Sequence, residues 1–219
     1  MIDIAANLDV VRQRIATAAA NAGRNPADVT LIAVSKTKPL ALVEAALAAG
    51  QISFGENYAQ ELQEKSQQQA ADWHFIGPLQ SNKTKLIANQ AQWVHSIDRL
   101  KIAQRLSDQR SAELPPLNVC IQVNISDEPQ KAGVPVNEVA ELAAQIKRRP
   151  NVVLRGLMCI PKPDDAGAFE RMRDLFEQLN EGGCQLDCLS MGMSSDFEAA
   201  IAAGATHVRV GTAIFGSRK

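Results

Sequence analysis

The chain is short of aromatic residues, of cysteine and of net charge. Of its 219 residues only 4% are aromatic and one is tyrosine, while 23 basic residues stand against 24 acidic ones. Without an excess of positive charge there is no broad field for nucleic-acid backbones, whereas a small anionic ligand is still compatible with this charge balance. No apolar run is long enough to cross a bilayer, and residues 1–7 carry no basic segment ahead of an apolar core. We therefore expect a cytoplasmic protein with no nucleic-acid or membrane partner.

Cysteine is too sparse for a disulfide framework, and its spacing does not fit a zinc finger. Cys184 and Cys188 are four positions apart, but no second cysteine or histidine pair stands at finger spacing. We expect Cys120, Cys159 and this pair to be reduced thiols in or near strands. A chain of this length buries roughly two-thirds or more of its unfolded surface, so it needs no structural metal. We expect one domain over residues 1–219.

Two hydrophobic spacings alternate along the chain. Apolar residues recur every three or four positions over residues 4–22 and stop at Gly23, which predicts a leading helix. Short apolar or β-branched runs then alternate with alanine-rich helical runs, and no two strands are close enough to form a hairpin. Eight strands are predicted, with a helix after each of the first seven. The strands end near Lys36, Glu56, Gly77, Ile97, Asn124, Ile160, Met191 and Gly211.

The intervals between these strand ends suit parallel strands joined by helices. They run from 20 to 36 residues, enough for a turn, a helix and a strand. Eight such units favour an α/β fold, a single (β/α)8 barrel of the TIM type with an extra N-terminal helix. The alternative is an open doubly wound sheet, which is disfavoured because no Gly-x-Gly-x-x-Gly follows the first strand.

A lysine stands at the end of the first predicted strand, in Val34-Ser-Lys36-Thr-Lys38-Pro39. In a barrel, functional groups collect at the C-terminal ends of the strands, so Lys36 is expected at the mouth of the barrel. Partial burial and the neighbouring Lys38 would both disfavour its ammonium form, and a neutral lysine can attack a carbonyl to form a Schiff base. The alternative is that both lysines are ordinary solvated loop residues.

The last two strands end in glycine and hydroxyl residues ahead of helices. Ser194 and Ser195 precede one helix, and Gly211 and Thr212 precede another. Backbone N–H groups at such helix starts can hold an anion, and the loops after strands seven and eight are the recurrent phosphate site of barrels. Ser195 also forms a capping box with Glu198 in this reading, which leaves Ser194 to face the ligand.

Two further polar residues are expected at the same end of the barrel. Arg209 lies between two valines of the last strand, so its guanidinium should point into the mouth, towards either a core carboxylate or a ring nitrogen of a ligand. Asn57 follows the second strand and is expected to bond a ligand hydroxyl or to cap a helix. A nucleophilic lysine, an anion site and an inward arginine fit an aldehyde, a phosphate and a basic ring nitrogen. Pyridoxal phosphate has all three.

Several of these motifs carry a family resemblance. The segments AVSKTKP at 33–39, FGENY at 54–58, WHFIGPLQSNK at 73–83, GLM at 156–158, LSMGMSSD at 189–196 and HVRVGT at 207–212 resemble the YggS/PROSC family of pyridoxal phosphate homeostasis proteins. The match spans nearly the whole chain, with the motifs in order at successive strand ends.

The resemblance implies a barrel related to the N-terminal domain of alanine racemases, with pyridoxal 5'-phosphate held as an aldimine on Lys36. It also implies that Arg209 faces the pyridine nitrogen and that Ser194, Gly211 and Thr212 form the phosphate nest. Family members are regarded as carriers that serve vitamin B6 and amino-acid homeostasis, without an established reaction. Enzymes that lack their pyridoxal phosphate are the expected recipients.

Chemistry favours a carrier over the alternative of a weak amino-acid racemase. An arginine at the ring nitrogen disfavours its protonation and so weakens the cofactor as an electron sink. A racemase also needs proton-transfer groups on both faces of the substrate carbon. Lys36 is the only candidate, because Tyr58 is expected to pack at the start of a helix. A third hypothesis, an aldolase-like barrel without the cofactor, uses Lys36 as a Schiff-base lysine.

The remaining predictions concern residues outside this set. His74, His95 and His207 are dispersed along the sequence and are predicted to be core or rim residues rather than metal ligands. Lys131 lies in a polar loop after the fifth strand, where it could exchange cofactor with Lys36. We expect a monomer with no metal.

Overall fold

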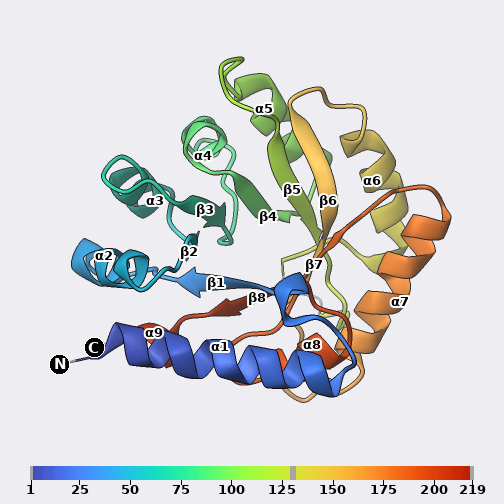
Figure 1. The fold of residues 1–219 in the computed structure, drawn as a ribbon. Coiled ribbons are helices and arrows are strands. Elements are labelled where there is room, and N and C mark those ends of the chain that lie inside the picture. Colours follow the sequence, from blue (N-terminus) through green and yellow to red (C-terminus); the bar gives the residue numbers. More distant parts are fainter. Residues whose placement is uncertain (1, 129–131, 218–219) are drawn as a thin grey trace.

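The centre of the protein is a closed barrel of eight parallel strands (Figure 1). The computed structural model describes residues 2–128 and 132–217. Each strand pairs with the next along the chain, and the eighth closes the barrel by pairing with the first. The strands are β1 (Thr30–Val34), β2 (Ser53–Glu56), β3 (Asp72–Phe75), β4 (Trp93–Ile97), β5 (Leu117–Gln122), β6 (Val152–Met158), β7 (Cys188–Ser190) and β8 (His207–Val210).

A helix follows every strand and lies on the outside of the barrel (Figure 1). These helices are α2 (Leu40–Ala48), α3 (Ala59–Ser66), α4 (Thr84–Gln90), α5 (Leu100–Gln109), α6 (Val139–Ile146), α7 (Ala168–Glu181), α8 (Phe197–Ala202) and α9 (Thr212–Phe215). Short 3-10 helices precede β1 and α6, at η1 (Pro26–Asp28) and η2 (Val136–Glu138). The parallel strands can be joined only by such crossovers, since a tight turn would reverse the chain.

The N-terminal helix α1 (Ile4–Asn21) adds an extra element to the repeating pattern. It lies along α8 and α9 and also contacts α2, so it covers the barrel where the first and last strands meet (Figure 1). Its buried face is made by Ile4, Leu8, Val11 and Ile15, which recur at helical spacing. The predicted barrel with an extra N-terminal helix is therefore confirmed.

The strand ends agree with the sequence prediction to within two residues. β2 and β4 end at the predicted Glu56 and Ile97. Both strands are buried on both faces, as expected for a parallel sheet covered by helices outside and side chains inside. After β8, the helix start expected just beyond Gly211 and Thr212 is the short helix α9, which begins at Thr212 itself.

Close approach of two strands is made possible by Gly156 in β6. A β-carbon at this position would collide with the backbone carbonyl of Cys188 in β7. Gly156 also pairs with Cys120 of β5, and because it has no side chain the sulfur atoms of Cys120 and Cys188 approach to 3.5 Å. All four cysteines are free thiols, and Cys120, Cys159 and Cys188 are buried, as predicted for this class of residue.

Two local predictions about helix starts are wrong. Ser195 does not cap α8: the N-cap residue is Asp196, and Glu198 pairs instead with Arg14 of α1. Tyr58 precedes α3 but is 54% exposed rather than packed. Glu198 finds its partner on α1, and the ring of Tyr58 faces solvent. Local sequence encodes neither outcome.

Among the described residues, no helix is long and apolar enough to cross a membrane.

Candidate functional site

A cavity of about 500 Å³ opens at the C-terminal ends of the strands. All six residues predicted to hold a ligand line it: Lys36, Asn57, Ser194, Arg209, Gly211 and Thr212. They come from the loops after β1, β2, β7 and β8, from β8 itself and from the first residue of α9. These residues are far apart in the sequence, and they meet because the strand ends of a closed parallel barrel converge on one mouth. Apolar side chains, including Val34 and Ile76, complete the wall.

Lys36 stands two residues beyond the end of β1. β1 pairs with β2 on one side and with β8 on the other, so the Lys36 loop lies between the loops that carry Asn57 and Gly211. Its neighbour Lys38 does not line the cavity. Lys38 Nζ instead donates to the carbonyl oxygens of Gly216 and Ser217, both at 3.0 Å, and so ties down the segment after α9. The two lysines of this loop therefore have different surroundings.

Arg209 is buried and fixed by neutral groups. Its Nη1 donates to the carbonyl and hydroxyl oxygens of Ser190 at 2.7 and 2.8 Å, and its Nη2 donates to the carbonyl of Cys159 at 2.9 Å. No carboxylate pairs with it among the described residues, so the first alternative considered for Arg209, a core carboxylate partner, is wrong. Burial lowers the pKa of its guanidinium from the usual value. The guanidinium is held at the cavity wall with its charge unneutralised.

Asn57 places an unsatisfied acceptor in the same wall. Its side-chain Oδ1 is buried and has no hydrogen-bond partner in the part of the chain that the structure describes. The helix-capping alternative for Asn57 is also wrong, because the N-cap of α3 is Tyr58, which makes no side-chain cap bond. A buried acceptor without a donor costs free energy, so this oxygen is suited to a donor group on a ligand.

Hydroxyl groups and a glycine line the side of the cavity below α8 and α9. Among the described residues, the hydroxyls of Ser194 and Thr212 make no protein hydrogen bond. Gly211 packs closely on β1: a β-carbon there would lie 3.1 Å from the carbonyl oxygen of Val34. The glycine therefore brings the start of α9 against the strand that leads to Lys36. An arrangement of this kind offers hydroxyl and backbone groups to an anion.

An ionic network lies beneath the Lys36 loop, and sequence reasoning missed it. Lys65 of α3 is 6% exposed, and its Nζ lies 2.7 Å from Glu56 Oε1 and 3.1 Å from Glu61 Oε2. Burial raises the pKa of Glu56 to about 7, although the charge of Lys65 opposes this rise. The available sequence signal was a glutamate within a short apolar strand and an i,i+4 Glu–Lys pair on the following helix.

The three histidines gather inside the barrel instead of being dispersed. The ring of His74 lies 5.1 Å from that of His95 and 6.2 Å from that of His207, measured between centroids. β3 and β8 are not neighbours, so these rings can meet only in the interior. His74 and His95 are fully buried and belong to the core, as predicted, whereas His207 is half-buried. Within residues 2–128 and 132–217, no three histidine, cysteine or acidic side chains are placed to hold a metal ion.

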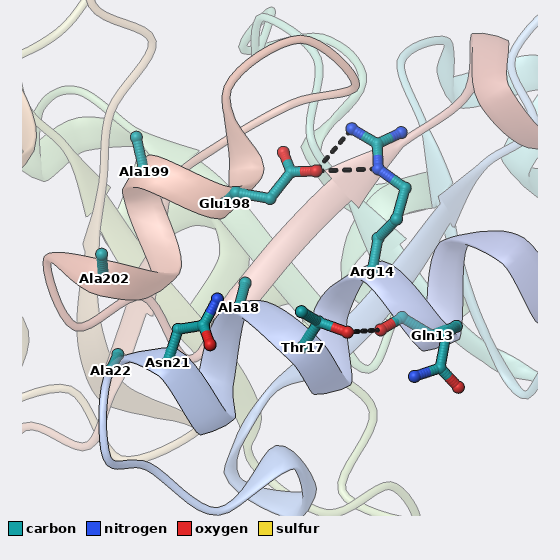
Figure 2. A pocket seen from close by; sticks show the side chains of 9 residues that line it. All are labelled: Gln13, Arg14, Thr17, Ala18, Asn21, Ala22, Glu198, Ala199 and Ala202. Atoms are coloured by element: carbon teal, nitrogen blue, oxygen red, sulfur yellow. Dashed lines mark hydrogen bonds and ion pairs between the residues drawn. The ribbon is translucent and has the colours of Figure 1, made fainter.

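A second cavity of similar size, about 510 Å³, lies between α1 and α8 on the outside of the barrel (Figure 2). Its charged side chains, Arg14 and Glu198, pair with each other. Arg14 bonds Glu198 at 2.6 Å, and the Thr17 hydroxyl donates to the carbonyl of Gln13 at 2.9 Å. Alanines from both helices make up most of the remaining lining (Figure 2). It contains no nucleophile, so the barrel mouth is the stronger candidate site.

Two residues considered from the sequence stand apart from the main cavity. Tyr58 lines a smaller cavity of about 160 Å³, which shares Asn57 with the main one. Lys131, predicted to exchange cofactor with Lys36, lies outside the described residues.

Comparison with known proteins places this barrel among characterised relatives. Residues 6–219 match the family model described as alanine racemase, N-terminal domain. A protein from Pseudomonas aeruginosa is 57% identical over 226 residues, covering 100% of this chain and 97% of the relative, and is named pyridoxal phosphate homeostasis protein. This chain is a member of the pyridoxal phosphate homeostasis protein family. Another family member, from Escherichia coli, is 53% identical over 229 residues, covering 100% of this chain and 98% of the relative.

A solved relative of this homeostasis family has the same barrel. PipY from Synechococcus elongatus is 36% identical, and the alignment covers 97% of this chain and 100% of PipY. The TM-score is 0.84 for PipY with pyridoxal phosphate bound and 0.85 for PipY without it. PipY therefore holds pyridoxal phosphate with almost no change in its overall agreement with the fold of this chain.

Proposed function

We propose that this protein binds pyridoxal 5'-phosphate in the barrel mouth and carries it through a covalent bond to Lys36. The observation that carries the proposal is the convergence of a lysine, an unneutralised arginine and two unbonded hydroxyls on one cavity, beside the orphaned Asn57 Oδ1. Bond formation would join Lys36 Nζ to the aldehyde carbon and release the oxygen as water. When bound, the cofactor supplies an aldehyde and an electron-accepting ring.

Each lining residue has a distinct role in this proposal. Ser194, Gly211 and Thr212 hold the phosphate, because hydroxyl and backbone donors favour its negative charge. Arg209 faces the ring nitrogen and keeps it unprotonated, since a fixed positive charge opposes a second one nearby. Asn57 Oδ1 accepts from a ligand hydroxyl and so satisfies its own hydrogen-bonding requirement.

The arrangement favours a carrier over an enzyme. Of the described residues that line the cavity, Lys36 is the only one with a side chain suited to take a proton from a substrate carbon. A racemase needs a second such group on the opposite face. We infer a role in vitamin B6 and amino-acid homeostasis, with cofactor-free enzymes as recipients. The homeostasis names of its relatives support this inference. We further propose a cytoplasmic monomer with one domain over residues 1–219.

The test is a visible absorption spectrum of the purified protein with added pyridoxal phosphate, followed by borohydride reduction and peptide mapping. We expect a yellow protein with the reduced label on the peptide that contains Lys36. Lys38→Ala is the matched control, because Lys38 belongs to the same loop but bonds the C-terminal segment; its label should remain on Lys36. Pyridoxal, which lacks the phosphate, should bind about 100-fold more weakly. A colourless protein, or a label confined to other lysines, contradicts the proposal.

A further inference from the structure

The backbone on both sides of Lys36 is held by charged side chains of α3. Lys65 Nζ donates to the carbonyl oxygen of Ser35 at 2.8 Å. On the other side, the N–H of Thr37 donates to Glu61 Oε2 at 2.7 Å. The residue before Lys36 and the residue after it are thus tied to two side chains that bond each other. The Cα of Lys36 lies between these two attachments.

Lys65, which holds Glu61, is itself fixed by Glu56 of β2. Lys65 Nζ bonds Glu56 Oε1 at 2.7 Å, and the hydroxyl of Ser35 donates to the same oxygen at 2.7 Å. Glu56 is fully buried, so the network has little freedom to rearrange. Buried ion pairs are weak contributors to stability because their desolvation offsets their attraction. Their geometry is nevertheless well defined, because each charged group requires its partners.

Thr37 adds a second sign that this loop is held in place. Its φ is +61°, in the left-handed region that a β-branched residue rarely occupies. Such a conformation persists only where the surroundings enforce it, and the charge-assisted bond from its N–H to Glu61 does so here. The φ angle of Thr37 and the two peptide groups that flank Lys36 are therefore constrained. The direction in which the Lys36 side chain leaves the backbone is constrained as a result.

We infer that Glu61 and Lys65 are positioning residues that aim Lys36 at the aldehyde carbon of the bound cofactor. The inference rests on the proposed function, because it assigns these residues a role in attachment to Lys36. Neither residue lines the cavity. They act through the Lys36 backbone and should therefore govern formation of the covalent bond, but not recognition of the phosphate and ring.

The experiment compares two ligands that differ only in the aldehyde. Pyridoxal 5'-phosphate can bond covalently to Lys36, whereas pyridoxine 5'-phosphate carries an alcohol in place of the aldehyde and cannot. Affinity for both is measured for the wild-type protein, for Glu61→Ala and for Glu64→Ala. Glu64 lies on the same helix, is exposed and makes no side-chain contact with the loop, so it controls for loss of one negative charge.

Glu61→Ala should weaken binding of pyridoxal phosphate about tenfold, which corresponds to about 1.4 kcal/mol. Binding of pyridoxine phosphate should change by less than about twofold. Glu64→Ala should match the wild type for both ligands. Glu61→Gln should recover part of the loss, since its amide oxygen still accepts from Thr37, and it provides a second variant should Glu61→Ala fail to fold.

Two outcomes would overturn the inference. Equal weakening of both ligands in Glu61→Ala would assign Glu61 a general structural role in the cavity. Unchanged binding of both ligands would show that Lys36 needs no such support. Either outcome is distinct from failure of the proposed function, in which the wild-type protein forms no bond to Lys36 at all.

Discussion

The two ends of the barrel interior are both rich in polar groups but differ in how these groups are satisfied. At the mouth, within residues 2–128 and 132–217, Arg209 carries a charge with no carboxylate partner and Asn57 Oδ1 lacks a donor. Towards the N-terminal ends of the strands, which we call the floor, the polar groups bond mostly to each other, and His95 Nδ1 is an exception that has no partner among the described residues. His74 bonds both Asp72, at 3.0 Å, and His95, at 2.9 Å.

Aromatic rings and charged side chains pack together at the floor. The ring of Trp93 stacks on His74 at 5.5 Å, and the guanidinium of Arg155 lies 4.9 Å from the Trp93 ring. Arg155 also pairs with Asp187. A set of polar groups that satisfy one another has little reason to bind a ligand, whereas unsatisfied groups around a cavity do. The difference supports our proposal that the mouth binds a ligand, and it indicates a structural role for the floor.

The largest effect should come from adding a side chain to the floor. Gly156→Ala places a β-carbon against the backbone carbonyl of Cys188, which a rotamer change cannot relieve. We expect a loss of about 3 kcal/mol or more in the free energy of unfolding, measured by urea denaturation. Gly211→Ala at the mouth meets Val34 O at 3.1 Å and should cost only about 1 kcal/mol. Equal losses in the two variants would remove this contrast.

Opposite pH dependences should sharpen the comparison further. The pKa of Glu56 is raised from 4.5 to about 7, so its contribution to stability is complete below about pH 4.5 and is lost as pH rises through about 7. That contribution amounts to up to about 3 kcal/mol. On the floor, burial lowers the pKa values of His74 and His95, so their contribution is present above about pH 6.5 and is lost on acidification.

Glu56→Gln should therefore make the protein more sensitive to acid, because only the histidine contribution remains. Urea denaturation at pH 5, 6 and 7 would measure this as a steeper loss of unfolding free energy than in the wild type. Glu64→Gln, an exposed position on α3, should leave the slope unchanged. Identical slopes for wild type and Glu56→Gln would mean that Glu56 titrates near its usual pKa.

The smallest effect on unfolding free energy is expected at Ser190, which lies between the floor and the mouth. Ser190 follows Cys188 by two positions on β7 and holds Arg209 through both its hydroxyl and its carbonyl oxygen. Ser190→Ala removes one acceptor and leaves the carbonyls of Ser190 and Cys159 in place. We expect a loss of about 1 kcal/mol in unfolding free energy. A loss of 3 kcal/mol or more would indicate that Arg209 depends on this hydroxyl far more than its other two bonds suggest.

The fold could be predicted because its signals are local. Apolar strands buried on both faces, helix-length intervals and glycines after helices each appear within a few residues of sequence. The convergence of six ligand-site candidates on one cavity follows from the barrel itself, since parallel strand ends share one mouth. Local signals failed at Ser195 and Tyr58, where α1 and solvent decided the outcome.

The ionic network was harder to foresee because a lysine on a helix is usually exposed. Lys65 can be buried because its side chain reaches from the last turn of α3 to Glu56 and the Ser35 carbonyl, which satisfy its charge. The sequence shows the Glu61 and Lys65 pair, but it does not show that their side chains reach the peptide groups beside Lys36.

The sequence by itself determined the eight strands, their parallel order and the residues at the barrel mouth, because each depends on spacing along the chain. Only the tertiary structure decided which groups meet across the interior. Arg209 bonds Ser190 and Cys159, and His74 approaches His207, because the stagger of eight strands sets which side chains share a level. That stagger depends on closure of the whole barrel, and no single segment encodes it.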